Sequence, residues 1–144
     1  MRAISLLASA LLAAGCATQP PPPLSDDMAR IEMSTVRPAD RLSAYRLDGE
    51  LIRELGFPDL QPGAHEVQVR FQYEQTGSAP GGGMMGEIQW RACILAVQYD
   101  DFRPGQTYRI VANQLGFSTV GWLESGADGE KLVSAEVLRC GPGA

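Results

Sequence analysis

Apolar and polar residues alternate along much of the chain, and this alternation predicts β-strands rather than helices. Between His65 and Tyr73 every second residue is apolar, which is typical of a strand with one buried and one solvated face. Residues 106–113 and 132–138 repeat the pattern, and 118–123 is a further strand. The residues expected to share a buried face are Val67, Val69, Phe71 and Tyr73 in the first strand, Tyr108, Ile110 and Ala112 in the second, and Val133, Ala135 and Val137 in the last.

Residues 88–99 predict a longer strand whose pattern changes partway along. In the first half the apolar Ile88, Trp90 and Ala92 alternate with polar residues, whereas residues 94–97 are apolar on both faces. Such a strand lies centrally in a sheet or carries a bulge. The alternation places Trp90 in the core with Ile88 and Ala92.

Aromatic residues suggest two uses. We expect Trp90, Trp122, Tyr99 and Tyr108 to fill the core, although Trp122 is less constrained because it follows Gly121. The alternative is an exposed aromatic set that stacks on the sugar rings of peptidoglycan or another polysaccharide.

Three segments before residue 60 are less regular. Residues 43–47 predict a strand that enters a tight turn at Asp48-Gly49. Residues 29–35 alternate and predict an edge strand, with a helix capped by Ser25 as the rival interpretation. Residues 51–55 are compatible with one short helical turn.

Turn signals separate the strands. Pro62-Gly63 and Pro104-Gly105 each precede a predicted strand. Asp128-Gly129 marks a hairpin between the last two predicted strands. About seven short strands with frequent turns predict a mainly β protein, a single antiparallel β-sandwich of Ig-like type.

One stretch resembles a known group of domains. A strand ending in Asp48-Gly49, followed by Leu-x-Pro-Gly-x-His-x-Val-x-Val from Leu60 to Val69, is similar to PEGA-type domains. The resemblance covers residues 43–73 best. It implies a small sandwich module of the bacterial envelope with a binding or structural role, and it carries no catalytic residues across.

The amino terminus has the pattern of an export signal. Arg2 precedes an apolar run over residues 4–14, which is too short to cross a membrane as a helix. The run ends in Leu-Ala-Ala-Gly-Cys at positions 12–16, which resembles the lipobox of bacterial lipoproteins, with Leu12 one position earlier than usual. The resemblance implies that residues 1–15 are removed and Cys16 is acylated. The alternative is an ordinary secretory signal cut near Ala14.

Four consecutive prolines follow the cysteine. Residues 20–23 favour an extended polyproline tether, so residues 16–28 are expected to hold a folded domain of residues 29–144 away from a membrane. By resemblance to enterobacterial sorting rules, the absence of Asp at position 17 implies the outer membrane, with the domain in the periplasm.

Charge narrows the classes of partner. The 144 residues include 12 basic and 17 acidic ones, for a formal net charge of −5. This balance argues against a nucleic-acid partner, which requires a basic surface.

Two cysteines remain after Cys16. An even pair in an exported domain predicts a disulfide, so we expect Cys93 to bond with Cys140 and to attach the last strand to the long one. Free thiols and a redox-active pair are the alternatives, although the Cys-x-x-Cys spacing typical of redox pairs is absent.

A glycine- and methionine-rich loop lies between the predicted strands that end near residue 75 and begin near residue 88. Gly82, Gly83, Met84 and Met85 form its tip. The methionines either fold back onto the sandwich or bind a partner, because methionine adapts to varied surfaces. The glycine spacing is not a dinucleotide site, since a strand rather than a helix follows it.

Candidate catalytic groups are sparse. His65 is the only histidine and follows a Pro-Gly turn, where we expect it to face solvent or bond the turn. A Cu(I) site joining it to methionines has no supporting spacing. The carboxylates of Asp100 and Asp101 lie in a turn, where aspartates commonly accept backbone hydrogen bonds. We therefore expect no enzyme activity, no cofactor and no metal. The leading hypothesis is a lipid-anchored module that binds an envelope protein, and peptidoglycan binding is its rival.

Overall fold

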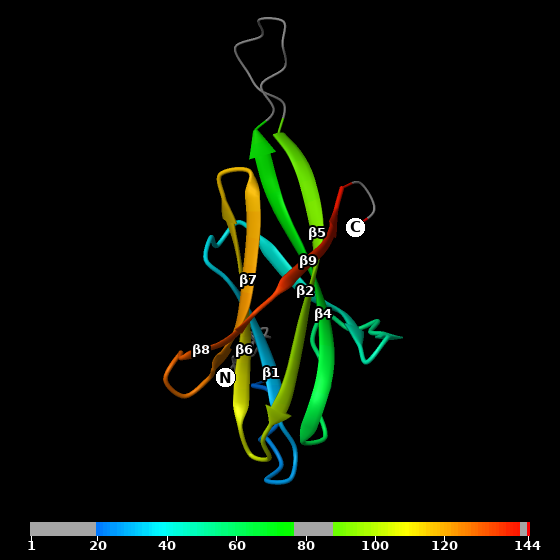
Figure 1. Cartoon of the computed structure of the whole chain (residues 1–144), viewed down its shortest axis with the longest axis vertical. Helices are drawn as coiled ribbons and strands as arrows, with labels where there is room; N and C mark the ends of the chain where they lie inside the picture. The colour runs from blue at the N-terminus through cyan, green and yellow to red at the C-terminus, as the bar shows by residue number, and fades with distance from the viewer. Residues whose placement is uncertain (1–19, 77–87, 142–143) are drawn as a thin grey trace, which may run out of the picture.

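The computed structural model describes residues 20–76, 88–141 and 144, and this part of the chain is built from strands (Figure 1). No helix in these residues is long and apolar enough to span a bilayer. The strands are β1 (Arg30–Thr35), β2 (Arg41–Leu47), β3 (Glu50–Leu51), β4 (Gly63–Thr76), β5 (Ile88–Phe102), β6 (Thr107–Leu115), β7 (Ser118–Ser125), β8 (Lys131–Ser134) and β9 (Glu136–Cys140).

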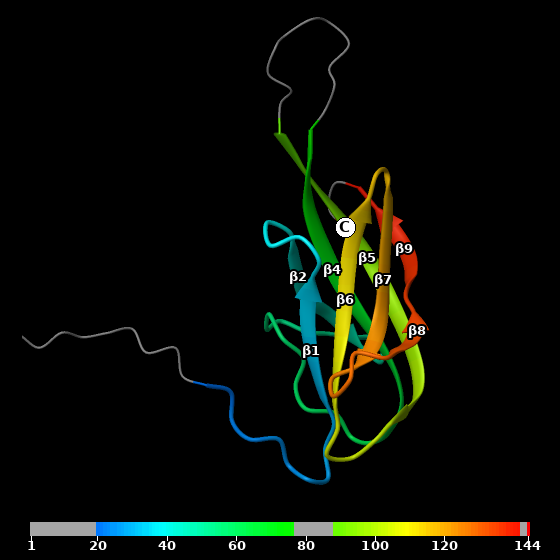
Figure 2. The same ribbon diagram turned by 90° about the vertical axis from the view of Figure 1, so that its left-hand side faces the viewer.

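Two sheets pack face to face, which confirms the predicted β-sandwich (Figure 2). One has the order β1-β6-β7-β8 and the other β3-β2-β4-β5-β9. The fold departs from a purely antiparallel sandwich in one place, because β1 pairs in parallel with β6. The predicted edge strand at 29–35 is confirmed as β1, and the rival helix from Ser25 does not form.

The core lies between the inner faces of the two sheets. Predicted apolar faces of β4 and β6 are confirmed, and Tyr108 and the half-buried Tyr99 pack with Phe102 as expected. The largest fully buried side chains of this core are Phe71, Phe102, Leu60, Leu95, Ile110 and Leu123. Burial of this apolar surface is the main favourable term in the stability of the fold.

The prediction for Trp90 is wrong. Cys93, Leu95 and Val97 set the inward phase of β5, so Trp90 belongs to the opposite phase and is 47% exposed on the outer face. The paired ends of β4 and β5 also run past the β6–β7 turn (Figure 2), and the other sheet does not cover them there. As expected for a central strand, β5 pairs on both sides, with β4 and β9.

The predicted strand at 132–138 is two strands, so the expected common face of Val133 and Val137 is also wrong. Ala135 still donates its N–H to the Gly121 carbonyl of β7 at 2.8 Å. The next residue, Glu136, already pairs with Ala96 in the other sheet. The chain therefore changes sheet at Ala135, which links the two layers at one side. Val137 is consequently 40% exposed at the new sheet edge.

The helical turn expected at 51–55 is also absent. Ile52 donates its N–H to the Tyr45 carbonyl at 2.9 Å, and the Ala44 N–H bonds the Leu55 carbonyl at 3.0 Å. The backbone of this segment thus bonds to β2 rather than to its own turn. The Asp48-Gly49 turn that precedes it is confirmed, with positive φ at both residues.

The disulfide is confirmed. Cys93 and Cys140 lie directly opposite each other on neighbouring antiparallel strands and are bonded. The bond joins the edge strand β9 to the long strand β5, as the cysteine count predicts.

Candidate binding surface

Two β-bulges shape the outer face of the five-stranded sheet. In β2 the register against β4 shifts between Ala44 and Arg46, which leaves Tyr45 unpaired. In β9 the register against β5 shifts so that Leu138 is unpaired. A bulge turns neighbouring residues toward one side of a sheet. Tyr45 and Arg46 therefore both lie on the outer face, and so do Leu138 and Arg139.

The two bulges face each other across β4 and β5. Between them lies an open pocket of about 260 Å³. Its lining residues come from four strands and are Tyr45, Arg46, Gln68, Ile94, Leu138 and Arg139. The pocket thus combines an apolar floor with cationic walls.

Three guanidinium groups surround the ring of Tyr45. The Cζ atoms of Arg70 and Arg46 lie 5.1 Å and 5.4 Å from the ring centroid, within cation–π range. The Nη2 atom of Arg139 donates a hydrogen bond to the Tyr45 hydroxyl at 3.1 Å. Contact with Arg46, together with the charges of the other two arginines, lowers the pKa of Tyr45 despite the opposing effect of burial.

A second cation–aromatic pair lies farther along the same face. The Cζ atom of Arg41 is 4.9 Å from the ring centroid of Trp90. Arg41 reaches this ring across β4, where its register partner is Gln72. We call the whole surface the arginine face and define it by Arg41, Tyr45, Arg46, Arg70, Trp90, Leu138 and Arg139.

The arginines of this face have no acidic partner among the described residues. Every ion pair found in this part of the chain involves other basic side chains. The buried Nε of Arg70 also lacks a hydrogen-bond partner there. Four like charges gathered on an acidic protein repel one another unless an anionic group approaches them.

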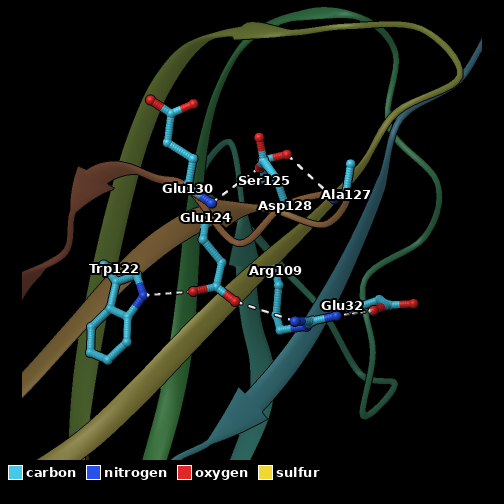
Figure 3. A network of polar contacts seen from close by, with 8 residues as sticks. All are labelled: Glu32, Arg109, Trp122, Glu124, Ser125, Ala127, Asp128 and Glu130. Atoms are coloured by element: carbon cyan, nitrogen blue, oxygen red, sulfur yellow. Dashed lines mark hydrogen bonds and ion pairs between the residues drawn. The ribbon is translucent and has the colours of Figure 1, made fainter.

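The outer face of the four-stranded sheet is different, because its charges satisfy one another (Figure 3). Arg109 lies between Glu32 at 3.5 Å and Glu124 at 3.3 Å. The second carboxylate oxygen of Glu124 accepts a hydrogen bond from Trp122 Nε1 at 3.0 Å. This network joins β1, β6 and β7, so its charges are occupied within the fold.

His65 has a structural role. Of the two expectations, that it faces solvent or that it bonds the turn, the second is confirmed. Its Nδ1 lies 2.6 Å from an Asp48 oxygen and its Nε2 lies 2.7 Å from the Gln61 carbonyl oxygen. Both ring nitrogens therefore contact acceptors. The turn expected at Asp100 and Asp101 is wrong, because β5 continues as a strand through Phe102. Asp101 pairs with Arg103. Within the described residues no cluster of three or more His, Cys, Asp or Glu side chains is placed to hold a metal ion.

The aromatic residues do not form one platform. Trp90 and Trp122 lie on the outer faces of opposite sheets, and Tyr108 is buried. The expectation that Trp122 fills the core is therefore also wrong, because its neighbour Leu123 is the inward, fully buried residue of β7. Tyr99 borders a larger open pocket of about 630 Å³ at the end of the sandwich where β5 turns into β6. The pocket is lined by Tyr99, Arg103, Pro104, Gln106, Thr107, Tyr108, Ser125, Glu130 and Leu132.

Several predicted site residues lie outside the described part of the chain, namely Cys16, Gly82, Gly83, Met84 and Met85. Sequence reasoning missed the arginine face. One signal was present, since alternation in β4 places Arg70 on its polar face. The remaining arginines come from other strands, and only the strand order and the two bulges bring them together.

Comparison with known proteins adds no relative. No protein-family model matches the chain, and neither the curated proteins nor the solved structures contain a match.

Proposed function

We propose that this protein is a lipid-anchored module of the bacterial outer membrane that binds another envelope protein without catalysing a reaction. The observation that carries the proposal is the arginine face. Trp, Tyr and Arg are the residue types that contribute most to binding energy in protein interfaces. Here they gather on one outer face of the sandwich.

The amino-terminal sequence supports the location. The lipobox-like residues 12–16 imply acylation of Cys16, and several acyl chains anchor a protein stably where one chain does not. The prolines at 20–23 are exposed and belong to no helix or strand, in a segment that runs away from the two sheets (Figure 2). Such a tether would leave the sandwich able to reach a partner in the periplasm. The resemblance of residues 43–73 to PEGA-type domains favours the same binding role.

The test is site-specific photo-cross-linking in cells that express the full, lipidated chain. A photoreactive residue at Gln72, beside Arg41 on the arginine face, should capture one dominant envelope protein. The matched control places the same residue at Asn113, on the four-stranded sheet. Capture from Asn113 alone, or from neither position, would contradict the proposal. A third probe is placed at Met84 or Met85, and capture from this position alone would indicate that the loop is the interface instead.

Peptidoglycan binding is the second candidate, and the pocket beside Tyr99 is the observation that favours it. Its volume suits a small ligand, and polar and aromatic side chains line it. Purified peptidoglycan should sediment with the protein if this candidate is correct. Absence of co-sedimentation would remove it.

A further inference from the structure

Resting on the proposed function, we infer that the arginine face binds an acidic segment of the partner protein, with two carboxylate side chains about 13 Å apart. One carboxylate would bind in the pocket between the bulges and the other beside Arg41. The spacing follows from β5, because Ile94 in the pocket and Trp90 beside Arg41 are four residues apart at about 3.3 Å per residue.

Stacking prepares the arginines for this ligand. A guanidinium group that lies over an aromatic ring keeps the N–H donors at its edge available for a bidentate carboxylate. Arg41 over Trp90 and Arg46 over Tyr45 both have this arrangement. Because the ring limits the motion of the side chain, less conformational entropy is lost on binding.

The centre of the arginine face is already covered by the chain itself, so the acidic segment would bind at two separate cationic positions on either side of it. Ala144 packs against Ala92 and Ile94 together with Tyr45. These small apolar contacts lie between the two cationic positions. A segment with a single carboxylate would reach only one of them, so two carboxylates at the matching distance should bind more tightly.

The charge of the arginine face favours an acidic protein segment as its ligand. Its four arginines form no ion pair with the residues that the structure describes, so their positive charge complements such a segment. Apolar surface at Leu138, which is 46% exposed, and at Trp90 adds contact area that an isolated small anion would not use. Inorganic phosphate and anionic lipid remain outcomes that the experiment separates from an acidic segment.

The experiment titrates the full mature chain, with its disulfide intact, against fluorescent synthetic peptides and, separately, against inorganic phosphate and phosphatidylglycerol vesicles. One peptide has Glu at positions 1 and 5 separated by three serines, a second has Glu at positions 1 and 2, and a third has Gln in place of both. The first should bind most tightly. Arg139→Gln and Arg41→Gln should each weaken it by about three- to tenfold. Lys131→Gln makes the same charge change on the other sheet and should leave binding within about twofold.

Three results would overturn the inference. These are equal binding of the two Glu peptides, equal weakening by Lys131→Gln, and binding only of inorganic phosphate or of phosphatidylglycerol vesicles. The proposed function is judged separately by the cross-linking at Gln72. A captured partner whose contact segment lacks paired acidic residues would contradict the inference and leave the proposed function intact.

Discussion

At the scale of single residues, His65 connects parts of the chain that are distant in sequence. Its ring lies between the Asp48 carboxylate and the Gln61 carbonyl, so it joins the β2–β3 turn to the turn that leads into β4. Burial alone would lower the pKa of His65, but the hydrogen bonds to these two acceptors outweigh it and raise the pKa. The protonated ring can donate to both acceptors, whereas the neutral ring can donate to only one.

This geometry predicts a pH-dependent stability. Because the pKa of His65 is raised in the folded state, its stabilisation is fully present below the unfolded pKa of about 6.5 and is lost as pH rises through the folded pKa. The pKa of Asp48 is lowered, despite burial, so its contribution declines only in acid. Melting temperatures from pH 5.5 to 8.5 should therefore fall with rising pH, by the equivalent of about 0.5–1 kcal/mol for this partly exposed pair.

His65→Gln is the matched variant for this measurement. It should be less stable than the natural protein at pH 5.5 and should lose most of the difference by pH 8.5. Parallel pH curves for the two proteins would show that the His65–Asp48 pair does not contribute to folding stability.

Residue-level patterns predict the core better than the arginine face. Alternation identified Val67, Val69 and Phe71 correctly because a fixed period of two relates them to one face. It failed at Trp90 because the phase of β5 is set by its second half. It could not find the pairing of Tyr45 with Arg139, since each of these faces the other only through a bulge that breaks the alternation.

At the scale of elements, β9 is an edge strand that buries little apolar surface. All five of its residues are exposed, yet it forms an edge of the five-stranded sheet. The bulge at Leu138 interrupts the regular edge, which hinders pairing with a strand from another molecule. The disulfide therefore supplies attachment that apolar burial does not.

Reduction of the disulfide should release β9 before the rest of the fold. The chain-entropy model assigns about 4 kcal/mol to a loop of this length, so the reduced protein should melt at a lower temperature. Hydrogen exchange should increase most over residues 136–140, because β4 and β5 keep their own ladder. Similar increases across all strands would contradict a local role, and the Cys93→Ser/Cys140→Ser variant provides a control without reductant.

Elements with strong local signals were predictable, and changes of sheet were not. Pro-Gly and Asp-Gly turns act over a few residues, so they mark strand ends reliably. The division of residues 131–140 into β8 and β9 depends on pairing with distant strands, since β8 pairs with β7 in one sheet and β9 pairs with β5 in the other. Ala135 has no glycine or proline beside it to mark the change.

At the scale of the whole molecule, the two outer faces of the sandwich differ in how their charges are paired. One face is occupied by the Glu32–Arg109–Glu124 network, and the other presents arginines without described ion pairs. Arg30 joins the tether to the domain, since it bonds the Pro22 carbonyl at 2.8 Å and pairs with Asp59. The proposed binding surface and the proposed anchor thus lie in different parts of the chain, so substitutions should affect them separately.

Cys16→Ser tests the anchor alone. The variant should carry no acyl chains and should leave the membrane fraction, while its folded domain melts at the same temperature as the natural one. Intact-protein mass spectrometry and membrane fractionation would measure these effects, with Cys93→Ser/Cys140→Ser as the control that should keep its acyl chains. Acyl chains on the Cys16→Ser protein would refute the assignment of Cys16 as the anchor.

The parallel pairing of β1 with β6 also has a mechanical consequence. If the amino terminus is anchored while a partner pulls on the arginine face, the load enters the domain through the start of β1. Force along the strand would strain the hydrogen bonds that support its six register pairs together, in shear, rather than opening them one after another. We therefore expect the anchored end to resist extension better than β9, whose short edge ladder would yield first once its covalent link is broken.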